Sequence, residues 1–88
     1  MSIYVIATRS TMGRVIHDAD TDETRAREAA RLRAEGLADD CGGTVEREQI
    51  PATKQARAMV PTVEVYHVKG GGLWVDVELY RINKETNG

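Results

Sequence analysis

Three aspartates at alternate positions are the residues of this sequence whose types and spacing come closest to a metal site. Asp18, Asp20 and Asp22 reproduce the spacing of the first three oxygen ligands of a calcium-binding loop. The rest of that loop is missing, because Glu23 replaces the glycine of the sixth position and Ala29 the glutamate of the twelfth. Capping and solvation of a helix start explain these carboxylates better, and we expect no metal or cofactor.

The potential nucleophiles and bases of the chain are scattered. His17, His67 and the single cysteine, Cys41, cannot supply the four ligands of a structural zinc site. Ser10 has no neighbours that would activate a nucleophile, and the glycine run 70–72 lacks the lysine and Ser/Thr that follow the glycines of a P-loop. We therefore expect no enzymatic activity, and we interpret His67 as a hydrogen-bonded residue on a packed face.

Length and charge narrow the class of protein further. The 88 residues suffice for one domain, which we expect to span residues 1–83 and to be followed by a frayed polar tail at 84–88. A net charge of −2 offers no attraction to phosphates or to an anionic membrane, so direct nucleic acid binding and membrane association are disfavoured. The lone cysteine and the lack of a signal sequence favour a cytoplasmic location.

Hydropathy patterns predict a two-layer α+β fold in which one helix packs on a mainly antiparallel sheet of four to five strands, in the order β-β-α-β-β-β. The predicted elements are strands at 3–8 and 14–17, a helix at 21–38, a polar edge strand at 44–50, a short helix or ordered loop at 51–61, and a hairpin at 62–82. The 44–50 strand is predicted at an edge because its middle is polar on both faces.

The predicted helix begins at Asp20 as its N-cap, with Glu23 as the capping-box partner. Its apolar stripe consists of small residues, namely Ala26, Ala29, Ala30, Ala34 and Leu37. Such a stripe allows close approach to a sheet but contributes little apolar area, so the sheet must supply most of the core. On the outer surface, Glu23 with Arg27 and Arg31 with Glu35 are predicted to form ion pairs.

The two arms of the hairpin alternate between apolar and polar residues, and the glycine run between them sets their register. We predict a three-residue loop at 70–72, which pairs Val65 with Val77 and Val63 with Leu79. The predicted core face then contains Val63, Val65, His67, Leu73, Val75, Val77 and Leu79. The predicted outer face contains Glu64, Tyr66, Val68, Trp74, Asp76, Glu78, Tyr80 and Ile82.

This outer face is aromatic and acidic. We predict that its residues Glu64, Tyr66, Trp74, Asp76, Glu78 and Tyr80 bind a protein with a basic surface. The alternative is that the aromatic rings only stabilise the hairpin, or that segment 51–61 covers them. Aromatic platforms for single-stranded RNA require basic neighbours, which this face lacks.

Four short segments, Tyr4-Val-Ile, Glu28-Ala-Ala-Arg-Leu32, Gly43-Thr-Val-Glu-Arg47 and Trp74-Val-Asp76, lie on these predicted elements. Their layout over most of the chain resembles that of small phage-encoded anti-CRISPR proteins of type I systems. The resemblance transfers no functional residue. It implies a non-enzymatic inhibitor that occupies a basic surface of a host protein complex.

Two further hypotheses stay open at this point. A small nucleic-acid-binding or regulatory module would gather basic residues on one side, namely Arg9, Arg14, Arg47, Lys54 and Arg57. A homodimer would use the polar 44–50 edge or the aromatic face.

Overall fold

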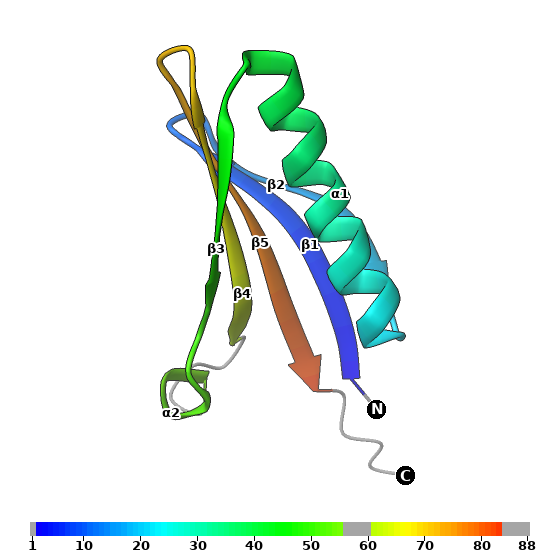
Figure 1. Ribbon diagram of the computed structural model, residues 1–88. Helices are drawn as coiled ribbons and strands as arrows, with labels where there is room; N and C mark the ends of the chain where they lie inside the picture. Colours follow the sequence, from blue (N-terminus) through cyan, green and yellow to red (C-terminus); the bar gives the residue numbers. More distant parts are fainter. Residues whose placement is uncertain (1, 56–60, 84–88) are drawn as a thin grey trace, which may run out of the picture.

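The computed structural model describes residues 2–55 and 61–83, and there one long helix packs on a five-stranded antiparallel sheet (Figure 1). The strands are β1 (Ser2–Ser10), β2 (Gly13–Asp20), β3 (Thr44–Gln49), β4 (Thr62–Gly70) and β5 (Leu73–Asn83); the helices are α1 (Glu23–Cys41) and α2 (Ala52–Gln55). This confirms the predicted two-layer α+β architecture and its element order. The predicted tail at 84–88 and part of the predicted 51–61 segment lie outside the described residues.

The strand order β2-β1-β5-β4-β3 places the last strand of the chain at the centre of the sheet. β5 pairs with β1 from Ser2 opposite Asn83 to Arg9 opposite Asp76, and its other side pairs with β4. β2 and β3 are consequently the two edges. The prediction of an edge strand at 44–50 is confirmed, and its exposed side chains are mostly charged or polar.

Helix α1 begins two residues later than predicted. Asp22 is the N-cap, and its side chain accepts a hydrogen bond of 3.1 Å from the backbone N–H of Arg25. The predicted cap, Asp20, still belongs to β2 and accepts hydrogen bonds from the backbone of Asp22 and from the Arg25 guanidinium. The helix ends at Cys41 and is capped by Gly42, whose φ of 66° is a left-handed conformation that favours glycine.

Every fourth residue of α1 from Ala26 to Ala38 is buried against the sheet, so the alanine stripe follows one i, i+4 row. The helix can approach closely, and the sheet fills the space with larger side chains. These are Tyr4, Ile6, Tyr66, Val68, Val77 and Leu79. As predicted, the sheet supplies most of the core and α1 contributes small side chains, although Ala29 and Leu37 are only partly buried.

The predicted register of the β4–β5 hairpin is wrong by one residue. Gly70 lies opposite Leu73, which leaves a two-residue turn of Gly71 and Gly72, with φ of 56° and 77°. Positive φ at both central residues is the requirement of a type I′ turn, whose twist matches that of the two strands. Glu64 therefore lies opposite Leu79, and Tyr66 opposite Val77.

Because side chains alternate along a strand, this shift moves every side chain of β4 to the other face of the sheet. The face under α1 now carries Glu64, Tyr66 and Val68 together with Val75, Val77 and Leu79. The predicted core residues Val63, Val65 and His67 lie on the opposite face. Tyr66 occupies the core because a large ring fills the space that alanines leave beneath α1.

Substitution of Gly72 by alanine tests the turn. A left-handed backbone costs an L-residue about 1–2 kcal/mol, so we expect Gly72→Ala to lower the free energy of unfolding by about 1 kcal/mol in urea titrations. Gly36→Ala is the control, because a Cβ there meets nothing within 4 Å and alanine favours the helix. An unchanged urea midpoint for Gly72→Ala would contradict the two-residue turn.

Candidate protein-binding face

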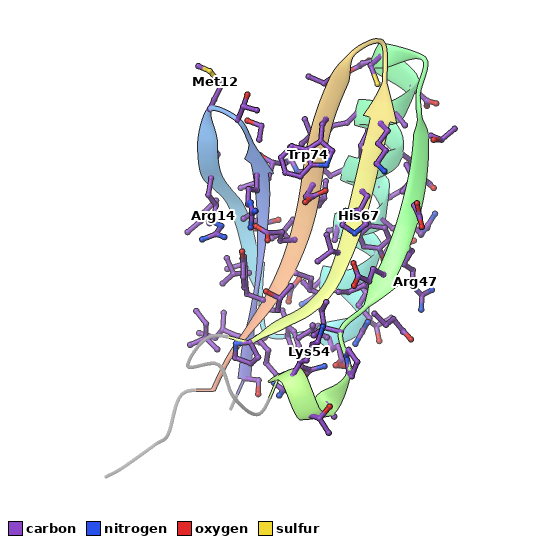
Figure 2. The ribbon with its side chains drawn as sticks, turned by 90° about the vertical axis from the view of Figure 1, so that its left-hand side faces the viewer. Met12, Arg14, Arg47, Lys54, His67 and Trp74 are labelled. Atoms are coloured by element: carbon purple, nitrogen blue, oxygen red, sulfur yellow. The ribbon has the colours of Figure 1, made fainter. Side chains whose placement is uncertain are left out.

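The side of the sheet opposite α1, here called the open face, carries the candidate site. Figure 2 looks onto this face, with Arg14, Trp74 and His67 projecting from the strands and α1 lying behind the sheet. Four of the six predicted partner-binding residues share it, namely Trp74, Asp76, Glu78 and Tyr80. They alternate along β5 because successive side chains of a strand point to opposite faces.

The other two predicted partner-binding residues, Glu64 and Tyr66, point towards α1. Tyr66 is 4% exposed and Glu64 is 1% exposed, so neither side chain is available to a partner. Burial and the adjacent Glu64 raise the pKa of Tyr66. The predicted aromatic and acidic face is thus divided between the two sides of the sheet.

Glu64 is held by two arginines from different elements. Arg27 of α1 and Arg47 of β3 both form ion pairs with its carboxylate. A buried carboxylate requires such compensation, and this one joins the helix to the β3 edge. The sequence signal for it is a glutamate within the apolar strand Val63 to Val68, but the two arginines are remote in sequence.

Glu78, on the open face, is neutralised in the same manner. It is 5% exposed, lies 3.1 Å from Nε of Arg14 and accepts a 2.6 Å hydrogen bond from the Tyr80 hydroxyl. The Arg14 guanidinium lies 5.3 Å from the centre of the Tyr80 ring, a cation–π contact. Burial, followed by the hydrogen bond to Glu78, raises the pKa of Tyr80 to about 12.

His67 joins three strands on the open face. Its Nδ1 lies 2.8 Å from Asp76 of β5, and its Nε2 lies 2.8 Å from Glu48 of β3. The hydrogen bond to Glu48 raises the pKa of His67, and Asp76 adds to this, while burial opposes it. The prediction of a hydrogen-bonded histidine is confirmed, but His67 lies on the face opposite to the one predicted.

With its central acids paired, the open face presents apolar groups at the end where the two hairpin turns lie. Trp74 is 39% exposed on this face, and Met12 is 94% exposed in the β1–β2 turn; Leu73, which is 45% exposed, points to the other face, like Val75. Ile16 of β2, which is 68% exposed, borders a hollow of about 500 Å³ that Arg14, Tyr80 and Ile82 also line. Trp74 is one of the predicted partner-binding residues. Met12 and Ile16 are not, because they belong to a segment with little periodicity.

Other classes of site are not evident in the described residues. Within 2–55 and 61–83, His, Cys, Asp and Glu side chains form no group of three suited to a metal ion. Neither helix in this part of the chain has the length and apolar character needed to cross a bilayer. Comparison of the chain with protein-family models, with curated proteins and with solved structures finds no match.

Substitution of Arg27 tests whether its ion pair stabilises the buried carboxylate of Glu64. We expect Arg27→Met to lower the free energy of unfolding by about 3 kcal/mol, because it leaves a buried carboxylate with less compensation. Arg31→Met is the matched control, since its i, i+4 pair with Glu35 is exposed and contributes about 0.5 kcal/mol or less. Equal losses in urea denaturation would show that Glu64 does not depend on Arg27.

A proton NMR titration tests the His67 contacts. His67 should titrate above 6.5 and His17 below it, because burial and then Arg33 lower the pKa of His17. The stabilisation from His67 is complete below its unfolded pKa and is lost as the pH rises through its raised folded pKa. Glu48→Gln should lower the pKa of His67 and leave that of His17 unchanged; no change at His67 would contradict the contact.

Proposed function

We propose that this protein is a non-enzymatic protein-binding module whose open face, from Trp74 to the hairpin turns, contacts the partner. The main support is the exposure of Trp74 on the open face and of Met12 in the β1–β2 turn at the same end of the sheet. Exposed apolar groups gathered together often mark an interaction site. Tryptophan and methionine are enriched in protein interfaces, where they bury large areas.

The exposed acids of β3 at the edge of this face support a partner with a basic surface. Asp76 and Glu78 in its centre are buried and paired, whereas Glu46 and Glu48 on the neighbouring edge strand are exposed. Exposed cations lie on the same face as well, with Lys69 opposite Trp74 and Arg9 opposite Asp76. An apolar centre with a polar rim is the usual anatomy of an interface, and Glu46 and Glu48 are the rim residues that would meet a basic partner surface.

Such a module would act by occupying the partner's surface rather than by chemistry. The layout-level resemblance to phage-encoded anti-CRISPR proteins suggests that the occupied surface belongs to a host complex and that the protein acts in the cytoplasm as an inhibitor. The nucleic-acid alternative has less support. Arg14 is engaged by Glu78 and Arg47 by Glu64, so these two cations are already partly neutralised within the fold.

The test is a quantitative pull-down with three baits, the wild type, Trp74→Ala and Leu32→Ala. Leu32 is a matched control because it is 54% exposed but lies on α1, on the other side of the sheet. We expect a specific partner to be lost with Trp74→Ala and retained with Leu32→Ala. Its binding should weaken as salt rises from about 0.1 M to about 1 M, where the Debye length falls from about 10 Å to about 3 Å.

Partner binding that is unchanged both by Trp74→Ala and by rising salt would overturn the proposal. Anisotropy titrations with labelled single- and double-stranded DNA and RNA at low salt provide the second arm. Flat titrations are expected. Tight binding that falls steeply with salt would instead establish the nucleic-acid-binding alternative.

A further inference from the structure

The β2 edge of the sheet differs from the β3 edge in a way that favours pairing with another strand. Among the described strands, β2 pairs only with β1, so its outer backbone groups have no strand partner. Two neighbouring residues of β2 are apolar and exposed, Val15 at 57% and Ile16 at 68%, between Arg14 and His17. Its counterpart β3 carries Glu46, Arg47 and Glu48, and charged side chains are a common protection of an edge against association.

The helix layer leaves an apolar groove beside the same edge. Helix α1 packs mainly on β4 and β5 and contacts β2 least among the strands. A hollow of about 440 Å³ lies along this side of α1, lined by Ile6, Ala29, Leu32 and Leu37. Leu32 is 54% exposed there. Val15 lies on the same side of the sheet, because it pairs with Thr8, which in turn lies opposite the core residue Val77.

Charges on the rim of this groove suit a second copy of the same surface. Arg33 and the acids Asp18 and Asp40 line it together. In the part of the chain that the structure describes, none of the three takes part in an ion pair. In a two-fold contact, a residue i that meets j of the other copy has its own j met by i, so one pairing of Arg33 with Asp18 or Asp40 across the contact is made twice.

We propose that two copies of this chain associate through antiparallel pairing of their β2 strands. A two-fold axis perpendicular to the sheet joins the two sheets into one and keeps both α1 helices on the same side. The grooves beside the two helices then adjoin, and Leu32 and Val15 of both copies are buried in a shared apolar seam. This surface is separate from the Trp74 region of the open face, so the dimer does not depend on the proposed partner.

Mass in solution tests the dimer. Sedimentation equilibrium over a wide concentration range should give twice the chain mass of 9.7 kDa for the wild type. Leu32→Glu and Val15→Glu should give the chain mass alone. Leu73→Glu is the matched control, because Leu73 is 45% exposed at the other hairpin, and this variant should remain dimeric. Circular dichroism of each variant verifies that it folds.

A charge exchange sharpens the test without placing an acid in the apolar seam. Arg33→Asp alone and the double variant Asp18→Arg, Asp40→Arg should each dimerise more weakly than the wild type, and an equimolar mixture should recover the dimer. A monomeric wild type at all concentrations overturns the proposal. A dimer that persists in both Leu32→Glu and Val15→Glu also overturns it. If Trp74→Ala abolishes the dimer, self-association occurs through the open face instead.

Discussion

The register of the β4–β5 hairpin is the constraint on which the rest of the molecule depends. Because Gly71 and Gly72 both adopt left-handed backbone conformations, the chain reverses in two residues and Tyr66 lies opposite Val77. A reversal one residue longer would place Tyr66 on the outside and His67 beneath the helix. The turn therefore decides which side chains form the core and which form the open face.

This register has an electrostatic consequence, because it places Glu64 under the helix. The structure compensates with Arg27 from α1 and Arg47 from β3, two elements that this carboxylate holds together. On the open face Arg14 and Tyr80 do the same for Glu78. In some proteins buried charge pairs select one arrangement of the chain, and we interpret both clusters as having that role here. The Glu78 cluster also compensates an acidic charge in the centre of the open face.

The alanine stripe of α1 explains why the molecule has more than one candidate surface. A helix with small side chains lies close to the sheet, and here it lies mainly over β4 and β5. One helix cannot cover five strands, so a groove remains beside β2. Helix α1 lies on one side of the sheet only, and the open face is on the other (Figure 1). Two surfaces of different character result: an apolar groove with charges of both signs, and a sheet face with exposed Trp74.

The order of the elements, the polar edge at β3 and the alanine stripe of α1 can be predicted from the sequence alone. These features follow from local periodicity and composition, which a single segment carries without reference to the others. The predicted N-cap of α1 is Asp20, whereas the structure has Asp22. Both aspartates offer the same side-chain oxygen, and only the path of β2 selects between them.

The register of the hairpin and the partners of its buried acids depend instead on tertiary packing. Three consecutive glycines permit more than one turn, and the choice depends on whether a tyrosine or a histidine fits better under a helix of alanines. Arg27 and Arg47 are far from Glu64 in the sequence, so their shared role appears only when α1 and β3 meet β4. Alternation indicates that a strand has two faces, whereas packing decides which of them is buried.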